Sequence, residues 1–158
     1  MFTKFSFRVA ALCCAFLWSA HNAYAAVATV EAMSFGTMVS TNNNAQYDIT
    51  VNTDNSYTVD SSGFIVITPP QRGVYDIDSL PANRAILSVD VTQGGPLSFP
   101  GEQQMSLVDF QETHPATTDA FGVARITIGA TARTNGVGSG YPDRTYSGVI
   151  RIEINLAP

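Results

Sequence analysis

Cysteine, lysine and histidine are scarce in this chain of 158 residues, and most of the few that occur lie near its start. Both cysteines, Cys13 and Cys14, and the only lysine, Lys4, precede residue 26. If the first 25 residues are removed, no thiol remains, which excludes disulfides, a thiol nucleophile and a thiolate metal site. His114 is then the only histidine, so acid–base chemistry near neutral pH would depend on one imidazole.

The first 25 residues have the features of a secretory signal peptide. Lys4 and Arg8 precede an apolar run over residues 9–18, which is too short to span a bilayer. Ala23-Tyr24-Ala25 then forms an A-x-A cleavage signal. We predict cleavage after Ala25, export to the periplasm, cell surface or extracellular space, and one domain over residues 26–158. An uncleaved membrane anchor is the alternative, and it agrees less well with these features.

Positive charge is also scarce once the predicted signal peptide is removed. Six arginines then oppose thirteen carboxylates, a formal charge of about −7. Such a chain has no basic surface for nucleic acid or for an anionic membrane. We therefore expect no nucleic-acid partner and no membrane insertion after cleavage.

The hydrophobic pattern has a period of two and predicts an all-β fold. Near the end of the chain, Ile150, Ile152, Ile154 and Leu156 share one parity, whereas Arg151 and other polar residues occupy the other. This alternation is typical of a strand with one buried and one wet face. The residues from Phe121 to Ala130 alternate in the same way.

Turn residues divide the rest of the chain into short extended segments, and no window favours a helix longer than one turn. Roughly eight or nine short strands are typical of a sandwich or a barrel. Besides the two segments above, we expect strands over Val27 to Phe35, Gln46 to Val51, Ser56 to Val59, Phe64 to Thr68, Gly73 to Ile77, Ala85 to Thr92 and Gln104 to Phe110.

Candidate catalytic residues are few. His114 lies in a predicted loop, and no G-x-S-x-G motif provides a serine nucleophile for it. Asp76 and Asp78 share a strand parity, as a carboxylate pair for glycoside chemistry would, but charged residues at strand ends are usually only solvated. Asn42-Asn43-Asn44 and Asp54-Asn55 do not fit a calcium loop and are better explained as turns. We expect no enzyme activity, no metal and no cofactor.

The two terminal segments and one loop are the candidate interaction sites. We expect Val27, Val30 and Met33 to lie on a strand adjoining that of Ile150, Ile152 and Ile154, within one chain or between two chains. Strand donation between subunits and a self-complete domain both remain open. The Gly-rich loop over residues 134–142 carries Tyr141, which is either a recognition residue or part of a plain connection. The residues assigned to assembly are Val27, Val30, Met33, Phe35, Ile150, Ile152, Ile154 and Leu156.

Four short motifs, in this order and spacing, resemble a bacterial secreted family catalogued as domain of unknown function 4402. They are Met33-Ser34-Phe35-Gly36, the strand from Gln104 to Phe110, Val123 to Ala132, and Thr145 to Ile152. The resemblance implies an immunoglobulin-like antiparallel β-sandwich of about eight short strands. The family is similar in style to pilins and spore-coat-U-type subunits of chaperone–usher fibres, which receive a missing strand from the next subunit.

The resemblance also has two departures, one of which is Leu156 near the C-terminus, where pilins commonly carry an aromatic residue. Only seven residues, Ala26 to Ala32, precede Met33, so this stretch is a short donor, the subunit is terminal, or the domain completes itself. The expected function is a non-enzymatic subunit of a surface fibre or extracellular matrix, whose partners are copies of itself or related subunits, with a periplasmic chaperone and usher. The alternative is a monomeric secreted or periplasmic module that recognises glycan or protein through Tyr141.

Overall fold

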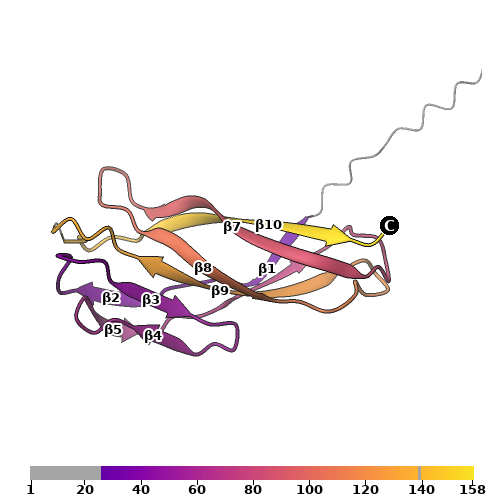
Figure 1. Ribbon diagram of the computed structural model, residues 1–158, viewed down its shortest axis with the longest axis horizontal. Coiled ribbons are helices and arrows are strands. Elements are labelled where there is room, and N and C mark those ends of the chain that lie inside the picture. The colour runs from indigo at the N-terminus through magenta and orange to yellow at the C-terminus, as the bar shows by residue number, and fades with distance from the viewer. Residues whose placement is uncertain (1–25, 139) are drawn as a thin grey trace, which may run out of the picture.

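A computed structural model describes residues 26–138 and 140–158, and these residues form an all-β structure (Figure 1). The predicted signal peptide lies outside this range. None of the described residues forms a helix that is long and apolar enough to cross a membrane. The strands are β1 (Val27–Glu31), β2 (Thr37–Ser40), β3 (Asp48–Val51), β4 (Tyr57–Val59), β5 (Phe64–Thr68), β6 (Gly73–Ile77), β7 (Ile86–Ser98), β8 (Ser106–Thr113), β9 (Ala124–Arg133) and β10 (Ser147–Leu156).

Strand β9 is the centre of the largest sheet. One of its edges pairs with β8, and the other pairs with β6 along residues 124–128 and with β3 along residues 130–133. Strands β3 and β6 therefore lie end to end along the same strand. The sheet is completed by β1 beside β6 and by β4 beside β3, and every pairing is antiparallel. Gly129 lies at the junction, where a side chain would come within 2.4 Å of the Val51 carbonyl oxygen.

Two further strand pairs pack around this sheet. The long strands β7 and β10 pair with each other from Ser147↔Ser98 to Leu156↔Ile86. Strands β2 and β5 form a second pair, in which Val39 lies opposite Ile65. A bridge between Ser34 and Gln71 connects the β1–β6 ladder to the β2–β5 ladder, so the segment from β1 to β2 runs beside the segment from β5 to β6.

The core lies between these layers in two clusters of buried side chains. The first joins β6, β7 and β9, with Ile126 and Ile128 fully buried at its centre. The second joins β3, β5, β8 and β9 through Tyr47, Ile49, Phe64, Leu107 and Ala132. The alternation predicted for β9 is confirmed, because Ala124, Ile126, Ile128, Ala130 and Ala132 all point inward and are fully buried.

Three predicted boundaries were wrong. Strand β7 does not stop at Thr92 but continues to Ser98, because the register with β10 shifts on both sides of Val149 and so accommodates the Gly94-Gly95-Pro96 stretch. Strand β8 extends past Phe110 to Thr113. The opening segment breaks after Glu31, and a strand over Thr37–Ser40 was missed.

Candidate functional site: an open groove between β2 and β10

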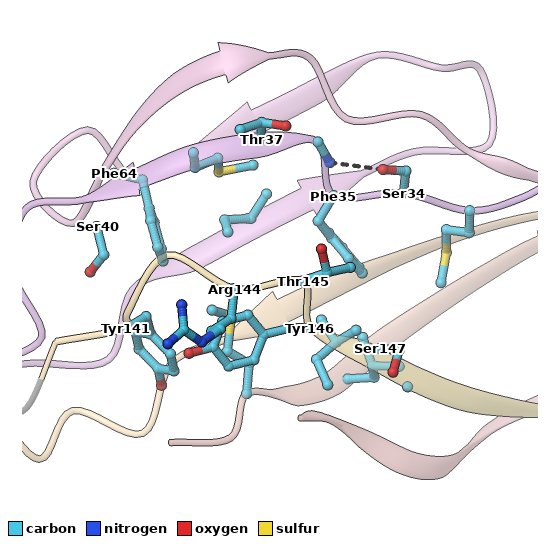
Figure 2. A pocket seen from close by; sticks show the side chains of 18 of the residues that line it. Ser34, Phe35, Thr37, Ser40, Phe64, Tyr141, Arg144, Thr145, Tyr146 and Ser147 are labelled. Atoms are coloured by element: carbon cyan, nitrogen blue, oxygen red, sulfur yellow. Dashed lines mark hydrogen bonds between the residues drawn. The ribbon is translucent and has the colours of Figure 1, made fainter. Parts of the chain in front are cut away.

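A groove with a volume of about 1210 Å³ opens between the β2 segment and the start of β10 (Figure 2). One wall is the chain from Met33 to Ser40, and the other is the chain from Tyr141 to Gly148. Phe35 and Phe64 point from one side toward Tyr141 and Tyr146 on the other (Figure 2). In the described part of the chain, β2 pairs only with β5 and β10 pairs only with β7. Each strand therefore keeps an edge without a partner strand.

The floor of the groove is made of buried core side chains and one partly buried residue of β10. Ile49, Phe64 and Leu107 belong to the second buried cluster and line the groove, together with Ile150 of β10. Ile150 packs against both clusters yet is only partly buried. Ile152, Ile154 and Leu156 also point inward along β10; they pack against the first cluster and are each only partly buried. The core-facing row of β10 is therefore open, in contrast to the sealed row of β9.

Two buried polar atoms in the walls of the groove have no hydrogen-bond partner among residues 26–138 and 140–158. These atoms are the Ser40 hydroxyl oxygen on β2 and the Tyr146 hydroxyl oxygen on the opposite wall. A buried polar atom without a partner costs roughly 1–3 kcal/mol, so native proteins rarely leave one unsatisfied. Burial, followed by the nearby negative charge of Glu102, raises the pKa of the Tyr146 phenol above its ordinary value of 10.0. The hydroxyl therefore stays neutral and can donate a hydrogen bond.

The wall from Tyr141 to Gly148 contains two aromatic residues and one arginine. The rings of Tyr141 and Tyr146 meet edge to face with centroids 5.8 Å apart, and the Arg144 guanidinium lies 5.6 Å from the centroid of Phe99. Tyr141 is fixed from both directions, since its hydroxyl donates to the Gln104 carbonyl at 3.2 Å and accepts from the Asn135 backbone N–H at 3.1 Å. The hydroxyl of Tyr141 is thus engaged within the fold, which fixes its ring in the groove wall.

The residues assigned to assembly fall into two groups. Phe35, Met33 and Ile150 line the groove, and Ile152, Ile154 and Leu156 continue the β10 row along the first core cluster. Val27 and Val30 lie elsewhere, on β1, where all five residues are exposed and the ladder to β6 is interrupted by a bulge between Thr29 and Glu31. In the described residues, no strand pairing joins β1 to β10 of the same chain. The predicted pairing of these two strands could therefore form only between two chains.

The candidate catalytic residues do not converge. His114 makes a hydrogen bond to the adjacent Pro115 carbonyl at 2.9 Å, at the end of β8. Asp76 forms two hydrogen bonds of 2.7 and 2.8 Å with Arg125, which holds the pKa of its carboxyl below the ordinary value. Asp78 instead accepts from the neighbouring Ser79 hydroxyl. In residues 26–138 and 140–158, no three acidic, histidine or cysteine side chains gather where they could hold a metal ion.

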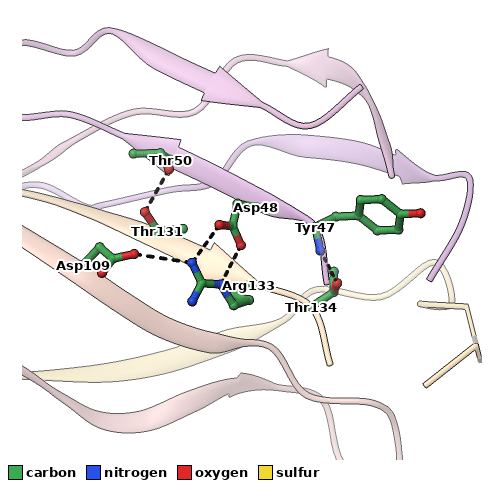
Figure 3. A network of polar contacts seen from close by, with 7 residues as sticks. All are labelled: Tyr47, Asp48, Thr50, Asp109, Thr131, Arg133 and Thr134. Carbon is green, nitrogen blue, oxygen red and sulfur yellow. Dashed lines mark hydrogen bonds and ion pairs between the residues drawn. The ribbon is translucent and has the colours of Figure 1, made fainter. Parts of the chain in front are cut away.

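A second ion-pair cluster covers the outer face of the large sheet (Figure 3). Arg133 makes two hydrogen bonds of 2.8 Å to Asp48 and an ion pair of 3.5 Å with Asp109. The Arg133 hydrogen bonds lower the pKa of Asp48 more than burial raises it. Asp109 occupies a β8 bulge with φ of 50°, a left-handed conformation that aspartate tolerates better than most residues. These contacts connect β3, β8 and β9.

Comparison with known proteins adds no relative to this geometry. The chain matches no family model, no curated protein and no solved structure. Any functional conclusion therefore depends on the groove itself.

Sequence reasoning selected part of each wall of the groove and missed the rest. Met33 and Phe35 of one wall, Tyr141 of the other and Ile150 of β10 were selected, whereas Ser40 and Tyr146 were not. The sequence signal for β2 was weak, because Thr37-Met38-Val39-Ser40 spans only four residues and places its two apolar residues next to each other rather than in alternation.

Proposed function

We propose that this protein is a non-enzymatic structural subunit of a bacterial surface fibre or extracellular matrix. Its fold is an immunoglobulin-like β-sandwich that lacks one strand, and the groove between β2 and β10 takes up an extended strand from a neighbouring subunit. The mature chain is exported, and a periplasmic chaperone and an usher are its expected partners before assembly.

The observation that carries this proposal is the contrast between the two inward-facing rows. Ile126 and Ile128 of β9 are fully buried, whereas Ile150, Ile152 and Ile154 of β10 remain partly in water. An extended segment with alternating apolar residues, placed beside β10, would cover this row and pair with the free strand edge. Strand addition of this kind gains affinity from backbone hydrogen bonds and specificity from pockets for alternate side chains.

The unpartnered hydroxyls favour a peptide strand over a lipid or another apolar ligand. An apolar ligand would leave Ser40 and Tyr146 unsatisfied and would seal them further from water. A strand brings backbone N–H and C=O groups at regular intervals, which supply partners to hydroxyls on either wall.

The donor that fits best is the β1 segment of a second copy. Val27 and Val30 are 56% and 48% exposed, so β1 gains little from apolar burial in its own domain. It is held by one ladder, and the bulge weakens that ladder. Detaching β1 therefore costs less than detaching a core strand would. One of its two valines gains burial in the groove of a neighbour, because residues 27 and 30 of an extended strand point to opposite faces.

The test uses the exported protein and a synthetic peptide with the sequence of residues 26–32. We expect the peptide to raise the melting temperature, and we expect deletion of residues 26–31 to abolish self-association while the domain remains folded. A peptide carrying Val27→Asp and Val30→Asp is the matched control and should have no effect. The proposal would be refuted if the full-length protein stayed monomeric at high concentration, did not bind the peptide and unfolded on truncation. That result would favour a self-complete module.

A further inference from the structure

The loop after β9 is organised by one buried side chain, Asn43, which is 2% exposed. Its amide nitrogen donates to the Asn135 side-chain oxygen at 2.9 Å, and its amide oxygen accepts from the Gly136 backbone N–H at 3.1 Å. Its backbone carbonyl also accepts from Gly138 at 2.7 Å. A single residue before β3 therefore holds three positions of a loop that lies about ninety residues further along the chain.

The two groups that Asn43 holds are also the two that react when asparagine precedes glycine. In that reaction the Gly136 nitrogen loses its proton and bonds to the Asn135 side-chain carbon Cγ. The Cγ–Nδ2 bond breaks, and ammonia leaves with the proton. Water then opens the resulting succinimide at either carbonyl and gives aspartate or isoaspartate. Glycine favours this ring closure because it has no side chain to obstruct the attack.

We propose that Asn135–Gly136 is a latent deamidation site that Asn43 keeps unreactive. The Gly136 N–H, which would supply the nucleophile, donates to the Asn43 side-chain oxygen. This hydrogen bond opposes deprotonation of the Gly136 nitrogen and directs the N–H away from the Asn135 side chain. The electrophilic side chain is fixed through its oxygen by Asn43 and by the Val137 N–H, and through its nitrogen by Gln103. Both reactants would have to break hydrogen bonds before they could meet.

Modification at this position would reach the groove. The Asn135 backbone N–H donates to the Tyr141 hydroxyl, which forms part of the groove wall. Isoaspartate inserts an extra carbon into the backbone, which displaces this N–H. It also replaces the amide donor to Gln103 with a carboxylate. The site thus links slow chemical ageing of the loop to the shape of the groove, and the inference does not depend on what the groove binds.

The test is prolonged incubation of the full exported chain at mildly alkaline pH, followed by peptide mapping by mass spectrometry. We expect Asn135 to persist in the native protein while a free peptide of residues 130–138 converts. Asn43→Ala should accelerate conversion roughly tenfold or more, the factor that corresponds to losing about one hydrogen bond of ordinary net strength.

Two controls separate loop opening from general unfolding. Tyr141→Phe removes the hydroxyl but leaves both Asn43 contacts, so it should accelerate the reaction much less. Asn55, which precedes Ser56 in a distant turn, serves as an internal reference in each map. Acceleration confined to Asn135 supports the proposal. Native Asn135 that converts at the rate of the free peptide, or an Asn43→Ala variant without acceleration at Asn135, would overturn it, as would equal acceleration at Asn55.

Discussion

Two isoleucines that both face the core, Ile128 on β9 and Ile150 on β10, should separate folding from strand binding when each is truncated. Ile128→Ala should mainly lower stability, and Ile150→Ala should mainly weaken strand binding. Ile128 is fully buried. Ile128→Ala therefore leaves a closed cavity and should lower the free energy of unfolding by about 2–5 kcal/mol. A domain of this size has a margin of roughly 5–15 kcal/mol, so the loss is readily measured.

Ile150 lines the groove and is partly exposed in the lone subunit. Its truncation enlarges a space already open to water, so the cavity cost falls away and we expect a loss of only about 1 kcal/mol. Once a donor strand covers the groove, the same side chain becomes buried. Ile150→Ala should then weaken binding of the peptide of residues 26–32 by roughly tenfold, equivalent to about 1.4 kcal/mol.

The assay combines chemical denaturation, for the free energy of unfolding, with calorimetric titration of the peptide. Val149→Ala is the matched control on the same strand, because Val149 is 63% exposed, and it should change both quantities by less than about 0.5 kcal/mol. If Ile150→Ala destabilised the lone subunit as much as Ile128→Ala and left peptide binding unchanged, the groove would be a closed core and the reasoning would fail.

Three further outcomes follow from the structure and its sequence. Asp48→Asn should lower stability at pH 7 by less than about 1 kcal/mol, because the Asp48 and Arg133 side chains are 42% and 35% exposed and solvent screens the pair. The pKa of Asp48 is lowered from 3.8, so the pair stabilises the fold above that pH, and the difference from the native chain should vanish in acid melts as pH falls through the lowered pKa. Gly129→Ala should cost about 1–3 kcal/mol in the same melts, because the added Cβ would lie 2.4 Å from the Val51 carbonyl oxygen. Gly140→Ala, whose added Cβ would have no atom within 4 Å, should leave stability unchanged, and equal effects of the two variants would contradict this. Intact-mass analysis of exported protein should give a chain that starts at Ala26, and a species retaining residues 1–25 would contradict the predicted cleavage.

The sequence predicted features that depend on local periodicity better than features that depend on distant contacts. The parity of β9 and β10 was correct because each strand carries long, regular alternation that only one orientation can bury. The end of β7 was misplaced because Gly94-Gly95-Pro96 has the composition of a turn, and only the bulged pairing with β10 reveals it as strand. Asn43 was interpreted as a turn residue, since nothing local indicates that its partners lie beyond β9. The groove was beyond local prediction because its walls are more than one hundred residues apart.

The paired charges on the outer face have a consequence for how copies meet in solution. Arg125 is paired with Asp76, and Arg133 is paired with Asp48 and Asp109. Few cations therefore remain to attract an acidic neighbour. With a formal charge of about −7 on the mature chain, copies should repel one another at low ionic strength. Physiological salt screens this repulsion beyond about 8 Å, while the apolar floor of the groove is unaffected by salt screening. Added salt should therefore accelerate the association of two copies. Contact at the groove floor is not opposed by like charge, because the floor is apolar.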